Sequence, residues 1–210
     1  MTNIRISELV ALAGTALSRY GLDQNKATII VTHLLEEELM GKSSHGFFRL
    51  PGIVKALGGV DNTREPYIEK QNEFSLLING ANHLGLIAAQ KACTYAKDIA
   101  IQSGIAMVGV TSYVGTTGAM GYYTRQLAKE NLIGICICTS EYAVAPWGGK
   151  DAIFGTNPIS IGIPTGAEPI VIDLATSART YGELMLAVKE GKRIPEGVVL
   201  DNKGMPSTDP

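Results

Sequence analysis

Residues 105–138, with the sequence IAMVGVTSYVGTTGAMGYYTRQLAKENLIGICIC, contain the pattern that decides the fold. Two short apolar runs, Ile105–Val110 and Ile133–Cys138, are typical of buried strands. The segment between them predicts a helix over about residues 117–131. A strand, a helix and a second strand in this order predict a layered α/β structure.

The same alternation continues on both sides of this segment. Before it, the run Phe74–Ile78 predicts a strand that ends at the turn signal Asn79-Gly80, and residues 84–103 predict a long helix that ends at Gly104. After it, we expect two more strands and a helix, at Ile159–Ile163, Ile170–Ile172 and about Tyr181–Glu190. The expected fold class is therefore α/β, with α+β layers.

The first 60 residues differ, because they predict helices alone. Ser7 is placed to cap a first helix that ends at Gly21, and Asp23 to cap a second that ends at Gly41. A third, short helix is expected over residues 47–57. The pattern changes near residues 60–73, so we expect two domains, a helical unit over residues 1–70 and an α/β domain over residues 71–210.

Composition excludes several classes of protein. The 210 residues contain 18 basic and 20 acidic side chains, and this balance argues against a nucleic-acid partner, which would need a basic face. Apolar residues make up 45%, enough to argue against disorder, yet no run approaches the roughly 18 apolar residues of a membrane span. The N-terminus lacks the features of a signal peptide, and the three cysteines are interpreted as reduced thiols of a cytoplasmic protein. Cys136-x-Cys138 has no further ligand nearby, so no metal site is expected.

The first candidate for chemistry is the stretch Ser43-Ser-His-Gly-Phe-Phe-Arg49, which lies between two predicted helices. His45 can exchange a proton near neutral pH, Ser44 can hydrogen-bond a reacting oxygen, and Arg49 can bind a carboxylate through two hydrogen bonds. The alternative is that Ser44 caps a helix and Arg49 is a solvated surface residue. Spacing alone favours this alternative.

A glycine-rich turn after the strand Ile105–Val110 is the second candidate. Its spacing, Gly115-x-x-Gly118-x-x-Gly121, differs from the dinucleotide fingerprint, and Glu141 is a poor fit for the acidic residue that should follow. Tight packing of the turn is the favoured interpretation, and the glycine spacing disfavours a Rossmann-type dehydrogenase.

Two more loops, residues 145–149 and 155–158, contain glycine, proline and polar residues that either contact a ligand or form turns. Asp173 ends a predicted strand, where α/β sheets present ligand-binding groups. His33 lies on the apolar face of its helix and is expected in the core, while Glu36–Glu38 is interpreted as a solvated helix face.

Taken in order, these motifs resemble the malate/L-lactate dehydrogenase-like family, and the sequence is similar to members near ureidoglycolate dehydrogenase. The resemblance extends along the whole chain, in the stretches Ser44–Pro51, Gly118–Tyr123, Val144–Gly149, Gly155–Pro158, Asp173–Ser177 and Pro206–Pro210. It implies a mixed-sheet fold of the sulfolactate/malate dehydrogenase type. It also implies interconversion of a small 2-hydroxy acid and a 2-oxo acid with NAD or NADP, in a homodimer.

The resemblance also implies roles for individual residues. His45 would exchange the proton with the substrate oxygen, Ser44 would orient that oxygen, and Arg49 would hold the substrate carboxylate. The residues expected to contact the cofactor are Ser140, Thr156, Asn157, Asp173, Leu174 and Ala175.

Two departures from the family pattern matter. Several relatives carry a catalytic histidine at the position of Thr116, which cannot titrate near neutrality, so His45 is expected to act alone or the activity to be weakened. Family members also continue beyond Thr208-Asp-Pro210. The alternative to an active oxidoreductase is therefore a truncated, non-catalytic fragment that folds or dimerises without binding cofactor.

Overall fold

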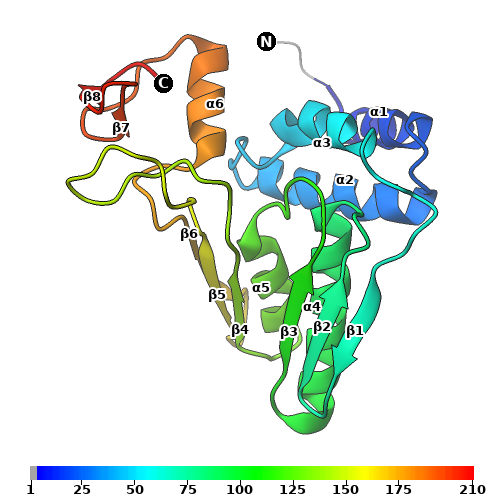
Figure 1. The fold of residues 1–210 in the computed structure, drawn as a ribbon. Coiled ribbons are helices and arrows are strands. Elements are labelled where there is room, and N and C mark those ends of the chain that lie inside the picture. Colours follow the sequence, from blue (N-terminus) through cyan, green and yellow to red (C-terminus); the bar gives the residue numbers. More distant parts are fainter. Residues whose placement is uncertain (1–3) are drawn as a thin grey trace.

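The N-terminal part of the chain is helical, as predicted. The computed structural model describes residues 4–210 (Figure 1). Its first elements are α1 (Ile6–Arg19), α2 (Gln24–Leu39), the 3-10 helix η1 (Phe47–Arg49) and α3 (Leu50–Leu57). The Asp23 cap is confirmed, since its carboxylate accepts a hydrogen bond of 2.9 Å from the Lys26 amide. The Ser7 cap is wrong, because α1 begins one residue earlier and the extended Arg5 carbonyl already accepts from the Leu9 amide.

Two three-stranded sheets follow, each formed from strands that are close in sequence. The first contains β1 (Tyr67–Gln71), β2 (Ser75–Asn79) and β3 (Met107–Thr111), with β2 and β3 parallel and joined through α4 (Gly85–Ser103). Helix α5 (Met120–Lys129) then leads to the antiparallel second sheet of β4 (Gly134–Ile137), β5 (Ile159–Ile163) and β6 (Ile170–Leu174). The described chain ends with α6 (Tyr181–Glu190) and the small pair β7 (Val199–Leu200) and β8 (Pro206–Ser207).

The predicted α/β class is confirmed by this mixture of helices with parallel and antiparallel strands. The strand β1 was not predicted, because all five of its residues are exposed and no apolar alternation marks them. It also crosses the expected domain boundary at residue 70 and pairs with β2. The division into two domains stays a prediction.

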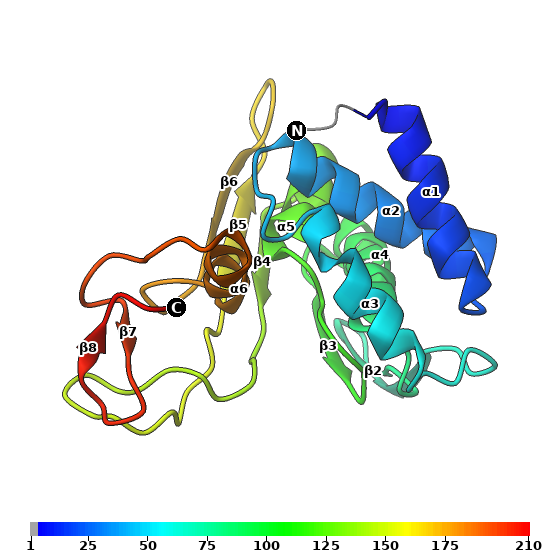
Figure 2. The ribbon, with the colours of Figure 1, turned by 90° about the horizontal axis from the view of Figure 1, so that it is seen from above.

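The helical unit rests on the first turns of α4. Leu17, Ile30 and Leu34 are buried in one apolar cluster that includes Leu84 and Leu86 from the start of α4. Figure 2 shows α1, α2 and α3 gathered beside this end of α4. This packing fixes the helical unit against the start of α4.

A second cluster fills the space between α4 and α5, where Cys93, Met120 and Tyr123 pack together. All three cysteines are free, as expected of reduced thiols. Burial raises the pKa of the Cys93 thiol to about 11 and that of Cys136 to about 12, so both stay protonated at neutral pH.

Across residues 4–210, no helix combines the length and apolarity needed to cross a membrane. The same residues contain no group of three or more His, Cys, Asp or Glu side chains arranged to hold a metal ion.

Candidate functional site

The loop between α2 and α3 is held in a compact shape by Glu38. Its carboxylate accepts hydrogen bonds from the Phe47 amide at 3.0 Å and from the Ser43 hydroxyl at 2.9 Å. Gly46 lets the loop approach this carboxylate, because a Cβ there would lie 2.1 Å from Glu38 Oε2. The side chains of Ser44, His45 and Arg49 are thereby placed in one short, rigid segment.

Ser44 and His45 form a hydrogen-bonded pair in this loop, with 3.1 Å between Ser44 Oγ and His45 Nδ1. Burial lowers the pKa of His45, and the neighbouring positive charges of Arg49 and Lys42 lower it further, while Asp173 and Glu183 oppose them. The imidazole is therefore mainly neutral at pH 7 and able to accept a proton.

Arg49 lies half-buried beneath α6. A Cβ at Gly182, in the first turn of α6, would lie 3.0 Å from the Ser44 carbonyl oxygen and 3.6 Å from Arg49 Cζ. The Nε atom of Arg49 is buried without a hydrogen-bond partner, and no carboxylate in residues 4–210 lies within 4.0 Å of its guanidinium. Arg49 is therefore not a solvated surface residue, and Ser44 does not cap a helix.

Lys42 connects this loop to the second sheet. Its ammonium group lies 3.2 Å from the carboxylate of Asp173, the fourth residue of β6. Gly121 of α5 permits Asp173 to sit here, since a Cβ at Gly121 would be 2.8 Å from Asp173 Oδ2. Sequence reasoning overlooked Lys42, because a single lysine after a helix gives no local sign of a distant partner.

The burial of Glu37 contradicts another prediction. It is fully buried, and both carboxylate oxygens lack hydrogen bonds, with Lys42 at 3.8 Å and Arg125 at 3.9 Å. The expectation of a solvated helix face over Glu36–Glu38 is wrong here, because α2 packs against α4 and α5 as well as α1 and so has little free surface. Burial raises the pKa of the Glu37 carboxyl.

His33 was expected in the core, and the structure confirms this. Its Nε2 atom accepts a hydrogen bond of 3.0 Å from the Ala119 amide, and its ring lies 4.2 Å from that of Tyr122. Burial lowers the pKa of His33 to about 3, so the ring stays neutral. It serves packing rather than proton transfer.

Three of the six residues expected to contact a cofactor come together in a polar loop cluster, defined here as Ser140, Thr156 and Asn157. The Ser140 hydroxyl lies 3.1 Å from Thr156 Oγ1 and accepts from the Thr156 amide at 2.8 Å. The side chain of Asn157 accepts from the Ser140 amide at 3.1 Å. Thr176 ties this cluster to the end of β6, donating to the Thr156 carbonyl at 3.1 Å.

The other three do not join the cluster through their side chains. Asp173 faces α5 and Lys42, whereas Leu174 lies on the opposite face of the sheet and is 48% exposed. Ala175 lies between Leu174 and Thr176, which contacts the cluster. Thr116 lies in the loop between β3 and α5, where its hydroxyl accepts from the Gly118 amide at 3.0 Å. Within residues 4–210, no hydrogen bond joins Thr116 to His45.

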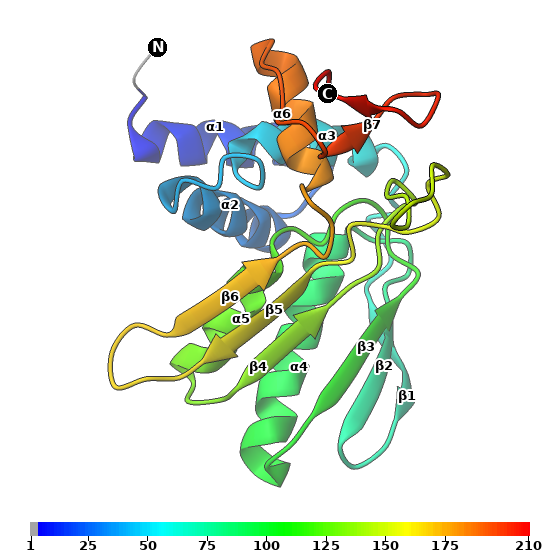
Figure 3. The ribbon, with the colours of Figure 1, turned by 90° about the vertical axis from the view of Figure 1, so that its left-hand side faces the viewer.

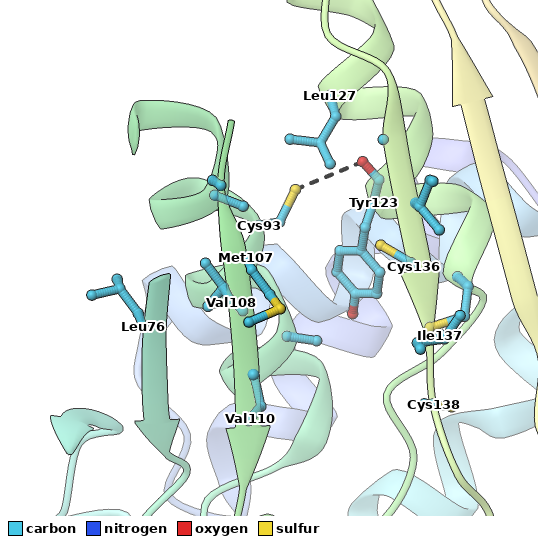
Figure 4. A pocket seen from close by; sticks show the side chains of 18 of the residues that line it. Leu76, Cys93, Met107, Val108, Val110, Tyr123, Leu127, Cys136, Ile137 and Cys138 are labelled. Atoms are coloured by element: carbon cyan, nitrogen blue, oxygen red, sulfur yellow. Dashed lines mark hydrogen bonds between the residues drawn. The ribbon is translucent and has the colours of Figure 1, made fainter. Parts of the chain in front are cut away.

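A large cavity of about 1440 Å³ opens between the two sheets, beside the polar loop cluster. Asn157 and Thr176 line it at the end nearest the cluster, and Figure 4 shows Met107, Tyr123 and Cys138 among its apolar walls. Hydroxyl and amide groups next to an apolar cavity suit a nicotinamide cofactor, which has polar ribose and carboxamide groups around an apolar ring face.

The class of protein follows from comparison with known sequences. A family model described as malate/L-lactate dehydrogenase matches residues 4–210, and the chain belongs to this family. The chain is 37% identical to the L-sulfolactate dehydrogenase of Methanothermobacter thermautotrophicus, over 99% of its own length and 62% of that protein.

Two other relatives carry a cofactor in their names. One is the ureidoglycolate dehydrogenase (NAD(+)) of Escherichia coli K12, 32% identical over 92% of this chain and 56% of its own length. The other is the (2R)-3-sulfolactate dehydrogenase (NADP(+)) of Chromohalobacter salexigens, 33% identical over 100% of this chain and 63% of its own length.

A solved structure agrees with the fold. The dehydrogenase from Sinorhizobium meliloti superposes with a TM-score of 0.93 and 32% identity, covering 99% of this chain and 62% of that one. The sulfolactate dehydrogenase from Methanocaldococcus jannaschii superposes with a TM-score of 0.86 and 30% identity, covering 98% of this chain and 60% of that one. The expected sulfolactate/malate dehydrogenase type of fold is thereby confirmed. The chain spans about 60% of the length of the relatives that it matches.

Proposed function

We propose that the Ser44–Arg49 loop and the polar loop cluster belong to one active site that interconverts a small 2-hydroxy acid and the corresponding 2-oxo acid, with NAD or NADP as cofactor. One observation carries the proposal: the half-buried Ser44–His45 pair lies beside the Arg49 guanidinium, whose buried Nε atom has no hydrogen-bond partner among residues 4–210. Proton exchange and carboxylate binding are therefore available side by side.

Arg49 supplies the binding of the substrate carboxylate in this proposal. A buried guanidinium nitrogen without a hydrogen bond costs free energy, which an incoming carboxylate recovers. The planar guanidinium can make two parallel hydrogen bonds to one carboxylate, and this fixes the orientation of the substrate as well as its affinity.

His45 supplies the proton exchange. The bound nicotinamide ring supplies the hydride for reduction, and accepts it in oxidation. In reduction, protonated His45 donates its proton to the carbonyl oxygen of the substrate, which would otherwise become an alkoxide. In oxidation, neutral His45 removes the proton of the substrate hydroxyl, and Ser44 holds that oxygen by a hydrogen bond.

The residues that would hold the cofactor are Ser140, Thr156 and Asn157, with the chain Asp173–Ala175 forming the wall towards the substrate. Their hydroxyl and amide groups suit the ribose and carboxamide groups of NAD and NADP alike. Among relatives whose names state a cofactor, both NAD(+) and NADP(+) occur, so a nicotinamide cofactor is supported without a choice between them.

The proposal is tested by replacing Arg49 with lysine, which keeps the positive charge and removes the planar fork. Losing a charge-assisted hydrogen bond of about 1.5–3 kcal/mol raises the KM for a 2-oxo acid by about 10–100-fold. NADH and NADPH oxidation with a panel of 2-oxo acids gives this value, with exposed Arg64→Lys as control. An unchanged KM in Arg49→Lys would remove Arg49 from substrate binding.

A second candidate is a non-catalytic chain that keeps the fold without binding cofactor. One observation favours it: branched aliphatic side chains on one face of the second sheet, among them Ile135, Ile137 and Ile172, are exposed. Thermal unfolding with millimolar NADH or NADPH separates the two candidates, because a ligand at 100 times its Kd adds about 2.7 kcal/mol to the native state. A rise in Tm supports the oxidoreductase, and an unchanged Tm supports the non-catalytic chain.

The same proposal includes a homodimer in the cytoplasm. The three free thiols are consistent with a reducing compartment. Sedimentation at several protein concentrations measures the oligomeric state, and a monomer at every concentration contradicts the dimer.

A further inference from the structure

A row of alternating charges lies beside the Ser44–Arg49 loop, where α2, α5 and β6 meet. Glu37 of α2 lies 3.8 Å from Lys42 and 3.9 Å from Arg125 of α5. Lys42 in turn lies 3.2 Å from Asp173 of β6. Figure 3 shows α2 above the second sheet, at the end where β6 stops, with α5 behind that sheet. Three elements that are distant in sequence are therefore joined by charged side chains.

Glu37 is the most deeply buried member of this row. Its side chain has no exposed surface, whereas the side chains of Lys42 and Asp173 are 39% and 12% exposed. A carboxylate loses its hydration on burial, so glutamate is almost never fully buried unless it is paired with a cation. Neither oxygen of Glu37 has a hydrogen bond within residues 4–210. The positive charges of Lys42 and Arg125 therefore compensate the charge of Glu37.

Lys42 is held weakly by Asp173 alone. An ion pair with a partly exposed lysine contributes little free energy, and ordering the lysine side chain costs a comparable amount of entropy. Glu37 adds a second carboxylate beside the ammonium group, and its carbonyl oxygen accepts a hydrogen bond of 2.9 Å from the Lys42 amide. If Lys42 moved into solvent, the buried Glu37 would keep only Arg125, so burial of Glu37 favours the paired position of Lys42.

The charges that act on the His45 ring come from its own loop, from β6 and from α6. The groups are Arg49, Lys42, Asp173 and Glu183. On α2, His33 lies near His45 but stays neutral, because burial holds its pKa at about 3. Glu37 lies next to Lys42, one of the groups that act on His45, and so has an indirect route to the ring.

We infer that Glu37 is a positioning residue of the proposed active site, which holds the Lys42 ammonium group against Asp173 and thereby fixes the charges around His45. The inference rests on the proposed function, in which His45 exchanges the proton. Glu37 contacts neither substrate nor cofactor and acts only through Lys42. With Lys42 held in place, its positive charge helps to keep His45 in the neutral form that removes a proton from a 2-hydroxy acid.

The ring titration of His45 tests this inference without any turnover. The chain contains three histidines, His33, His45 and His83, so NMR can follow each ring separately as the pH changes. We expect Glu37→Gln to release Lys42 and to raise the pKa of His45, so that the ring binds a proton about two- to fivefold more tightly. Direct loss of the negative charge of Glu37 would lower that pKa instead. The sign of the change therefore identifies the route.

A double variant tests the route through Lys42 more sharply. Lys42→Met raises the pKa of His45, and adding Glu37→Gln to it should have no further effect, because the two residues act as one unit. Glu36→Gln is the matched control and should leave the His45 titration unchanged, since Glu36 pairs with Arg125 at 3.8 Å. Glu37→Met removes the same charge with an apolar side chain of similar length, and replaces Glu37→Gln if that variant does not fold.

The inference is overturned if the His45 titration in Glu37→Gln or Glu37→Met is unchanged or moves to lower pH. It is also overturned if Glu37→Gln still changes the titration in the Lys42→Met background. Failure of the proposed function gives a different result. The His45 titration would then move as expected, while the pH profile of kcat/KM for oxidation stayed as in the wild type.

Discussion

At the scale of the residue, burial and nearby charges, Lys42 among them, set the pKa of His45, the group proposed to exchange the proton. Lys42 lies between Asp173 at 3.2 Å and the buried Glu37 at 3.8 Å, and its charge acts on His45 in the same loop. Burial and the positive charges of Arg49 and Lys42 hold the pKa of His45 below its usual 6.5, against the effect of Asp173 and Glu183. The loop thus keeps His45 neutral near pH 7, the form that oxidation of a 2-hydroxy acid requires.

This account predicts opposite pH shifts for two substitutions. Oxidation needs neutral His45, so kcat/KM falls as the pH drops through its pKa. Removing the positive charge in Lys42→Met raises that pKa and moves the fall to higher pH. Removing the negative charge in Asp173→Asn lowers it and moves the fall to lower pH. The measurement is the pH profile of kcat/KM for oxidation. The control is Lys97→Met, because Lys97 forms an ion pair with Glu130. Shifts in the same direction for both variants contradict the account.

A second prediction at this scale concerns the loss of stability when Gly118 is substituted. It has φ of +78°, and a Cβ would lie 2.3 Å from His33 Nε2. Gly104 has a nearly equal φ of +81°, with nothing within 4 Å of its Cβ position. Gly104→Ala should therefore cost only the left-handed backbone, about 1–2 kcal/mol, and Gly118→Ala about 1–3 kcal/mol more through overpacking. Urea unfolding of both variants measures the difference, and equal losses would contradict the contact with His33.

Sequence alone singled out the Ser44–Arg49 loop as a candidate site but did not predict the residues that surround it. The motif around His45 was found through its ordered resemblance to a family, while spacing favoured a surface interpretation. Glu37 and Lys42 gave no local signal, because their partners Arg125 and Asp173 are distant in sequence. Tertiary packing buried Glu37, against the pattern of three successive glutamates.

At the scale of the element, α6 covers the Ser44–Arg49 loop. Its first turn touches Ser44 and Arg49 through Gly182, and Lys189 near its end lies 5.1 Å from the centre of the Phe48 ring. A capping box fixes its start, with Thr180 and Glu183 each accepting a hydrogen bond from the other's backbone amide. The residues 181–190 of this helix were predicted correctly, since apolar spacing and the terminal Gly191 both mark it.

Removing the N-cap side chain of α6 should loosen the packing of this helix over the Ser44–Arg49 loop. Thr180→Ala leaves the Glu183 amide without its acceptor and costs about 1 kcal/mol of helix stability. Amide exchange in the first turn of α6 should therefore quicken by about fivefold. Thr94→Ala, at an exposed mid-helix position of α4, is the matched control and should change exchange in α6 little. Unchanged exchange in Thr180→Ala would indicate that packing alone holds the helix.

The strands show where element prediction succeeds and fails. The runs Ile159–Ile163 and Ile170–Leu174 are apolar and were found at nearly their observed bounds. Strand β1 consists of exposed residues and is specified by its pairing with β2 rather than by its own pattern. Which strands would pair with one another could not be predicted, because the apolar pattern is similar in all of them.

At the scale of the whole molecule, the proposed site combines three separate parts of the chain. The loop after α2 brings His45 and Arg49, the end of β6 brings Asp173 to Lys42, and the loop between β4 and β5 brings the polar loop cluster. The cavity between the two sheets adjoins this cluster at Asn157.

The central claim is that His45 exchanges the proton in a nicotinamide-dependent oxidoreductase, and turnover of His45→Gln tests it most directly. Oxidation of NADH or NADPH is measured with the 2-oxo acid that the wild-type protein reduces fastest. The account predicts that His45→Gln lowers kcat by about 10²–10⁴-fold, while the rise in Tm caused by the cofactor is kept. A kcat within about threefold of wild type would contradict it, because general acid–base catalysis by His45 could then contribute almost nothing.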